Sequence, residues 1–134
     1  MDKKLVRVSA ALIVKNKSFL AALRPVNKKL GGFWELPGGK VEPNEDPKDT
    51  CIREIREELN CNIKVNDKIT VCTFDYPDFI LQMDVFECEL IKDNYPSLIE
   101  HSALQWVNAQ NIFDFKWVPA DRDFLPLIKE KYLL

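Results

Sequence analysis

The feature that most constrains the fold is an amphipathic, acidic segment over residues 47–59. Asp46 before it is a good N-cap, and Pro47 suits the first position of a helix. Asn60 after it tolerates the left-handed backbone that closes many helices. Apolar residues recur through the segment at helical spacing, namely Cys51, Ile52, Ile55 and Leu59. The segment therefore predicts a helix that buries this side in the core.

Strand-like sequence surrounds this helix. Apolar residues and residues with high β-propensity are concentrated in short runs, at 6–14, 18–23, 33–36, 69–74, 79–90 and 103–107. A break is predicted at Pro37-Gly38-Gly39 and a helical turn at 109–113. Apolar residues at helical spacing predict one C-terminal helix over residues 121–132. The order of strands, helix, strands and helix predicts an α+β fold, a mixed-sheet sandwich, in a single domain over residues 1–134.

Charge and composition exclude several classes of protein. The chain has 134 residues with 19 basic and 21 acidic side chains, a formal net charge of −2. Proteins that bind nucleic-acid polymers normally carry a basic excess, so this balance argues against that class. No stretch approaches the roughly 20 apolar residues that cross a bilayer, and no signal-like segment opens the chain. We therefore expect a cytoplasmic protein with no membrane partner. The four cysteines lack zinc-site spacing, so we expect free, largely buried thiols.

Three glutamates share one face of the predicted helix, because Glu54, Glu57 and Glu58 are spaced i, i+3 and i+4. One interpretation is a solvated acidic face. The alternative is a site of clustered carboxylates, because Gly38 and Gly39 offer a backbone that a ligand can approach closely. Hard oxygen ligands of this kind suit Mg²⁺ or Mn²⁺. Metal ions held in this way neutralise phosphate oxygens and activate water.

The same segment resembles the signature sequence of the Nudix hydrolase family. The match comprises Gly39, Glu45, Arg53-Glu54-Ile55 and Glu57-Glu58 at the family's fixed spacing. Two positions depart from the family pattern, since Asn60 replaces a glycine and Cys61 replaces an aliphatic residue. Asn adopts the same backbone conformation at some cost, and Cys is a small apolar substitute. Neither change removes a catalytic group, so we expect activity to survive.

The resemblance implies a fold and a metal site. The family fold is an α/β/α sandwich with a mixed central sheet, in which the signature forms a loop and a helix. Glu54, Glu57 and Glu58 match the ligands of a divalent metal, which is Mg²⁺ with Mn²⁺ as a substitute. The backbone carbonyl of Gly38 or Gly39 matches a further ligand.

Segments outside the signature are similar to the MutT-type nucleoside-triphosphate pyrophosphohydrolases. They are FWELPGGKVE at 33–42, EHSALQW at 100–106 and PAD at 119–121. The similarity implies Mg²⁺-dependent hydrolysis of a nucleoside 5′-triphosphate to nucleoside monophosphate and pyrophosphate, with CTP, dCTP or an oxidised or modified dNTP as substrate. Two alternatives stay open. One is a Nudix hydrolase of another nucleoside diphosphate derivative, such as ADP-ribose or a dinucleoside polyphosphate, and the other is a non-catalytic nucleotide-binding module.

The resemblance also implies roles for single residues. Arg53 matches an arginine that orients a carboxylate of the signature, and Glu45 matches a glutamate with a structural role. Glu100 matches a glutamate close to the metals, which acts as ligand or as base. Arg24 matches an arginine that contacts the substrate. Lys40 follows the two glycines, where a lysine is placed to meet a phosphate as a point charge.

Asp121 matches the position that reads the base in MutT-type enzymes. An ionised carboxylate only accepts hydrogen bonds, so we expect it to favour an amino edge such as that of cytosine, with guanine-type N–H groups also open. Leu36 and Phe79 are expected to line the base pocket. The alternatives are a helix cap for Asp121, core packing for Phe79, and solvated loop charges for the other polar candidates. The lone histidine, His101, is interpreted as a loop or packing residue.

Overall fold

A computed structural model describes residues 3–134 as a mixed seven-stranded sheet. The strand order is β3-β2-β1-β6-β5, while β4 pairs with β1 and β7 pairs with β2. β1 and β6 are parallel and the other pairs are antiparallel. The strands are β1 (Lys4–Lys15), β2 (Ser18–Leu23), β3 (Trp34–Glu35), β4 (Gly38–Lys40), β5 (Ile63–Asp75), β6 (Phe79–Leu90) and β7 (Ala103–Val107).

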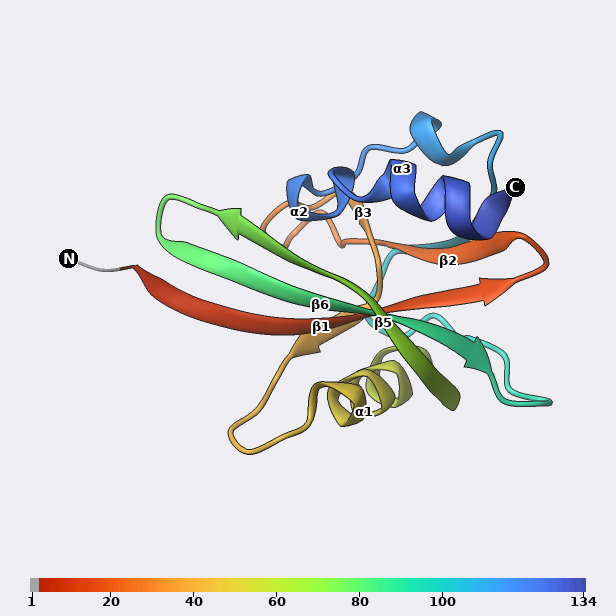
Figure 1. The fold of residues 1–134 in the computed structure, drawn as a ribbon, viewed down its shortest axis with the longest axis horizontal. Coiled ribbons are helices and arrows are strands. Elements are labelled where there is room, and N and C mark those ends of the chain that lie inside the picture. Colours follow the sequence, from red (N-terminus) through yellow and green to blue (C-terminus); the bar gives the residue numbers. More distant parts are fainter. Residues whose placement is uncertain (1–2) are drawn as a thin grey trace.

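Helices cover both faces of this sheet (Figure 1). Helix α1 (Pro47–Leu59) lies on one face. On the other lie α2 (Pro119–Arg122), α3 (Leu125–Ile128) and the π-helical turn Lys129–Leu133 that continues α3. A 3₁₀ turn at Ile112–Asp114 precedes them. The prediction of an α/β/α sandwich with a mixed central sheet is therefore confirmed.

Strand β1 shows how the sequence specifies two cores. Side chains along a strand point alternately to opposite faces. Ala10 and Leu12 pack with the C-terminal helices, whereas Ala11 and Ile13 pack against α1. Because both faces of β1 are buried, residues 10–13 are apolar without interruption. This central strand therefore fixes the sheet between the two helical layers.

Helix α1 has the predicted ends and the predicted core face. Asp46 caps it by accepting a hydrogen bond from the backbone N–H of Lys48 at 2.9 Å. Asn60 ends it in the left-handed conformation with φ of 50°. Cys51, Ile55 and Leu59 are fully buried, and Ile52 packs at the edge of the same cluster. Because this side of α1 is buried against the sheet, its polar side faces away from the core.

Replacing Asp46 by alanine is expected to lower the free energy of unfolding by about 1 kcal/mol, because the Lys48 N–H loses its capping acceptor. Urea denaturation of the variant and the parent protein measures the difference. Asp49→Ala in the first turn is the matched control and should cost only about 0.3 kcal/mol, since it interacts with the helix dipole alone. Equal losses in the two variants would contradict the capping role.

The predicted break at Pro37-Gly38-Gly39 is wrong in one respect. Gly38 and Gly39 form strand β4, which pairs with Ala10 and Ser9 of β1. A Cβ on Gly38 would overlap the backbone carbonyl of Ser9. The glycines here permit close packing of two backbones, which a sequence pattern alone does not distinguish from a turn. The first strand of the second half also begins earlier than predicted, at Ile63.

The C-terminal helix is the second correction. The prediction was one helix over residues 121–132, but the chain forms α2, breaks at Asp123 and Phe124, and resumes as α3. Pro126 explains the break, because it has no N–H to donate to the carbonyl of Arg122. Pro119 occupies the first turn of α2, so the helical region also starts earlier than predicted.

The remaining expectations concern cysteines and membrane segments. All four cysteines are free thiols, and Cys51, Cys61 and Cys88 are buried while Cys72 is partly buried. Within residues 3–134, no helix is both long and apolar enough to cross a membrane.

Candidate active site

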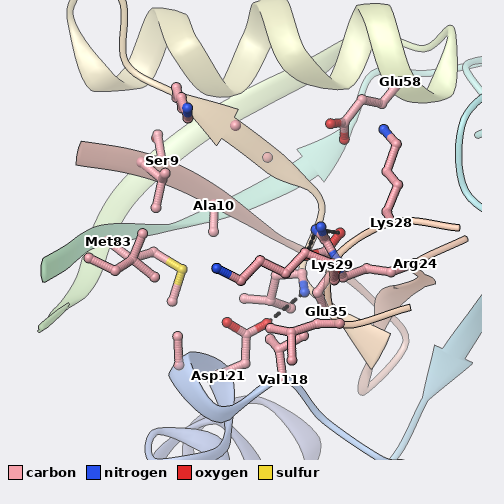
Figure 2. Close-up of a pocket in the computed structure, with 18 of the residues that line it drawn as sticks. Ser9, Ala10, Arg24, Lys28, Lys29, Glu35, Glu58, Met83, Val118 and Asp121 are labelled. Atoms are coloured by element: carbon pink, nitrogen blue, oxygen red, sulfur yellow. Dashed lines mark hydrogen bonds and ion pairs between the residues drawn. The ribbon is translucent and has the colours of Figure 1, made fainter. Parts of the chain in front are cut away.

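A cavity of about 300 Å³ opens between the sheet, the loop after β2 and helix α2 (Figure 2). It brings together most of the predicted site residues, namely Arg24, Leu36, Gly38, Gly39, Lys40, Glu58, Phe79, Glu100 and Asp121. Figure 2 shows Glu58 on one side and Asp121 on the other, with Arg24, Lys29 and Glu35 between them. Arg53, Glu54 and Glu57 do not line the cavity but lie on α1 with Glu58.

Glu58 is the carboxyl group that α1 presents to the cavity. Desolvation raises its pKa to about 8, and the negative charges of Glu54, Glu35 and Glu100 add to the shift. Its Oε2 is buried and has no hydrogen-bond partner among the described residues. A buried, unpaired carboxylate oxygen is costly unless a cation or a proton compensates it. The Oε2 of Glu58 is therefore well suited to bind a cation.

Glu54 lies directly behind the glycine strand. A Cβ at Gly39 would overlap the Glu54 carboxylate, so a larger residue here would push that carboxylate aside. Glu54 is also partly buried, and desolvation raises its pKa. The absence of a side chain at Gly39 thus lets α1 and β4 approach until the carboxylate touches the β4 backbone.

Arg53 joins the acidic residues of α1 to the preceding loop. Its Nε and Nη2 donate to the two carboxylate oxygens of Glu45 at 2.8 and 3.0 Å. Its Nη1 donates to Glu54 at 2.8 Å, and its Nη2 also reaches the carbonyl of Lys40 at 3.1 Å. Arg53 holds the pKa of Glu45 down to about 2, with help from the Thr50 hydroxyl. The guanidinium therefore fixes the loop, β4 and Glu54 relative to one another.

The residues present fit a hard cation. Glu54, Glu57, Glu58 and the β4 carbonyls offer only oxygen donors, which Mg²⁺ and Mn²⁺ prefer. The side chain of Glu57 is 57% exposed, and its Oε2 accepts a hydrogen bond from Nη1 of Arg53 at 3.4 Å. Among residues 3–134, no three acidic, histidine or cysteine side chains already converge as a metal shell. The unpartnered oxygen of Glu58 and the contact of the Glu54 carboxylate with the Gly39 backbone are the two observations that favour such an ion.

Asp121 forms the opposite end of the cavity. Its Oδ2 accepts a hydrogen bond from the backbone N–H of Leu36 at 2.8 Å, and the residue is almost fully buried. Desolvation raises the pKa of Asp121 to about 8. Burial therefore favours the neutral form of this carboxyl group, in contrast to the ionised carboxylate expected from the sequence. The helix-cap alternative is also wrong, since α2 begins after Val118, α3 begins after Phe124, and neither helix has a side-chain cap.

Several cavity residues were not predicted from the sequence. Lys28 and Lys29 line the cavity from the loop after β2, and the ammonium of Lys29 lies 5.5 Å from the centre of the Phe79 ring. Glu35 and His101 also line it, and they are bonded to each other. The interpretation of His101 as a loop residue holds, but its side chain faces a carboxylate and not the apolar core. The sequence pointed to this region through Glu100 and the segments FWELPGGKVE and EHSALQW, but it gave no sign of the contact between His101 and Glu35.

Comparisons with known proteins agree with this geometry. The model of a family described as the NUDIX domain matches residues 9–127. A CTP pyrophosphohydrolase of Escherichia coli K12 is 30% identical over 128 residues, which cover 94% of this chain and 90% of that protein. An 8-oxo-dGTP diphosphatase of Proteus vulgaris is 36% identical over 87 residues, which cover 64% of this chain and 78% of that protein.

Solved structures lead to the same family. The DNA mismatch repair protein MutT of methicillin-resistant Staphylococcus aureus 252 is 36% identical with a TM-score of 0.78, covering 97% of this chain and 99% of that one. The MutT protein of Methanosarcina mazei Go1 is 28% identical with a TM-score of 0.83, covering 98% of this chain and 97% of that one. The chain therefore belongs to the Nudix family, and it is a Nudix hydrolase of the MutT type.

Proposed function

We propose that the protein hydrolyses a nucleoside 5′-triphosphate between the α- and β-phosphates, releasing nucleoside monophosphate and pyrophosphate. One observation carries the proposal: a single cavity joins the acidic edge of α1 to an enclosed end formed by Leu36, Phe79 and Asp121. The first region suits a metal-bound polyphosphate and the second suits a base. Relatives named 8-oxo-dGTP diphosphatase and CTP pyrophosphohydrolase support the same class of substrate.

Nudix hydrolases generally use a divalent metal ion, and we propose Mg²⁺ here, with Mn²⁺ as a substitute. Glu54, Glu57 and Glu58 would hold it, together with the backbone carbonyl of Gly38 or Gly39. When bound, such an ion supplies charge neutralisation for the phosphates and a water of lowered pKa. The charges of the carboxylates alone would repel a polyphosphate, so this site requires the cation.

The remaining polar residues of the cavity bind, orient and accept a proton in this proposal. Arg24 and Lys40 contact the phosphates as fixed positive charges. Arg53 holds Glu54 in place through its contacts with Glu45 and the Lys40 carbonyl. Glu57 or Glu100 takes the proton of the attacking water.

At the base end, a protonated Asp121 changes the expected recognition. A neutral carboxyl both donates and accepts a hydrogen bond, whereas a carboxylate only accepts. One oxygen of Asp121 is engaged by the Leu36 N–H, which positions the group against Leu36 and Phe79. A base edge with an acceptor next to a donor is complementary to it. Cytosine, with N3 beside the N4 amino group, and guanine, with O6 beside the N1–H, both meet that condition.

The test is pyrophosphate release from a panel of triphosphates, with and without Mg²⁺. The panel contains CTP, dCTP, 5-methyl-dCTP, dGTP and 8-oxo-dGTP. We expect Mg²⁺-dependent turnover that favours one base. Asp121→Asn, which also donates and accepts, should keep that preference at pH 7, whereas Asp121→Ala should reduce it by roughly tenfold or more. If no triphosphate is cut, the proposal is wrong, and ADP-ribose and dinucleoside polyphosphates become the substrates to test.

Arg53→Lys is expected to lower kcat roughly 10- to 100-fold, because an ammonium does not reproduce the paired contacts with Glu45 and the contact with Glu54. The Mg²⁺ concentration needed for half-maximal activity should rise as well. Arg56→Lys is the matched control on the same helix, since the Arg56 side chain lies on the exposed side and, within residues 3–134, donates to Asn62 alone. Similar kinetics for both variants would contradict a role of Arg53 in positioning Glu54.

A further inference from the structure

Two other segments of the chain meet at the carboxylate of Glu35 on strand β3, and one of them is distant in the sequence. Nη1 of Arg24, which follows β2, donates to its two oxygens at 3.0 and 3.3 Å. Nε2 of His101, which precedes β7, lies 3.0 Å from its Oε2. The Arg24 Nε donates in addition to the carbonyl of Lys29 at 2.8 Å. Figure 2 shows Glu35 beside Arg24 in the cavity. Through its second contact, with His101, Glu35 links the loop after β2 to the segment before β7.

The chemistry of the His101 contact is defined by its partner. A carboxylate only accepts hydrogen bonds, so Nε2 of His101 carries the proton and donates it. The His101 side chain is 7% exposed, and its Nδ1 is buried without a partner among the described residues. An apolar side chain of this size would fill the same space without leaving a buried nitrogen unpaired. Packing alone therefore does not account for an imidazole at this position.

His101 lies in the long connection between β6 and β7 that carries Glu100 to the cavity. Leu98 and Ile99 project into solvent, and Glu100 is exposed at the cavity rim. Within residues 98–102, the hydrogen bonds to the rest of the described chain are two: Ser102 N–H to the Leu23 carbonyl at 2.9 Å, and His101 to Glu35. Both hydrogen bonds are made by residues that directly follow Glu100. The negative charge of Glu100 is close enough to Glu58 to raise its pKa.

We propose that Glu35 and His101 are positioning residues, which hold Glu100 and Arg24 at the two sides of the cavity for the hydrolysis of the triphosphate. The inference rests on the proposed function for its kinetic consequences. The hydrogen bond between His101 and Glu35, which we call the tether, is a property of the folded chain. It is testable without measuring turnover. Neither residue contacts the reacting atoms in this assignment, and each acts through the side chain or the loop that it fixes.

The first test is hydrogen–deuterium exchange of residues 98–102 in the full chain. In His101→Leu the amide of Ser102 should exchange at least tenfold faster than in the parent, because the neighbouring tether is lost. His101→Gln retains an N–H donor on a flexible stem and should restore most of the protection. Leu98→Ala changes an exposed residue of the same segment and is the matched control. Unchanged exchange in His101→Leu would overturn the tether.

The second test is a double-mutant cycle measured by pyrophosphate release. His101→Leu should lower kcat about tenfold or more while KM changes less than threefold, and His101→Gln should recover most of the loss. In a Glu100→Gln background, His101→Leu should have little further effect, because the side chain that it positions is already disabled. Effects that multiply in the double variant would show that His101 does not act through Glu100 and would overturn the inference.

Glu35→Gln provides an independent variant, because it keeps the size of the side chain but removes the charge that Arg24 and His101 share. It should raise KM, through Arg24, as well as lower kcat. Unchanged KM and kcat in Glu35→Gln would contradict the role of Glu35. A parent protein that cuts no triphosphate contradicts the proposed function, whereas normal exchange protection in His101→Leu contradicts the tether alone. The two failures are therefore distinguishable.

Discussion

Glu58→Gln is expected to reduce turnover of the triphosphate on the order of 10²–10³-fold or more, while the fold is retained. The substitution keeps the shape of the side chain and removes the one carboxylate of α1 that reaches the cavity. The buried, unpartnered Oε2 of Glu58 is the atom best suited to bind a cation, and a neutral amide binds Mg²⁺ poorly. The effect should therefore appear in kcat and in the Mg²⁺ requirement together.

Circular dichroism and urea denaturation distinguish this loss of turnover from unfolding. The variant should be at least as stable as the parent in the absence of metal, because a desolvated carboxyl next to Glu54 has been removed. Glu89→Gln is the control, since the one side-chain contact of Glu89 within residues 3–134 is an exposed ion pair with Lys64 on β5. Near-normal rates in Glu58→Gln would show that the metal assignment on α1 is wrong.

Asp121→Asn is expected to change how the stability of the protein depends on pH. The folded state holds the Asp121 proton up to about pH 8, whereas in the unfolded chain the group loses it near its ordinary pKa of 3.8. Between these values the folded state binds one more proton, so stability falls as pH rises, by about 1.4 kcal/mol per pH unit. The contribution is fully present below pH 3.8 and is lost as the pH rises through 8.

Urea denaturation at intervals from pH 5 to pH 8 measures this slope. The pKa of Glu58 is also raised and adds a slope of the same sign, but it does so equally in the parent and in the variant. The difference between the two proteins therefore isolates Asp121. The parent should lose stability relative to Asp121→Asn as the pH rises, while Asp123→Asn, on the exposed side of the same turn, should follow the parent. Parallel curves for the parent and Asp121→Asn would show that Asp121 is ionised when folded.

Helix α1 and its acidic face were predictable because their determinants are local. The Asp46 cap, Pro47 and the spacing of apolar residues lie within one helix and act over a few residues. The glycines were recognised as important but assigned to a break, because close packing against β1 depends on a partner strand about 30 residues away. The break in the C-terminal helix had a local cause, Pro126, that the apolar spacing obscured.

The sequence by itself determined the family, the strand over residues 6–14 that becomes β1, and the carboxylates that α1 carries, because local patterns along the chain express all three. Only the tertiary structure decided which carboxyl groups are charged and which residues touch. Asp121 meets Leu36 across 85 residues, and His101 meets Glu35 across 66. Burial of Asp121 raises its pKa, and burial is a property of the packed molecule. The charge state at the base end of the cavity and the tether at its rim therefore arise only when the distant segments come together.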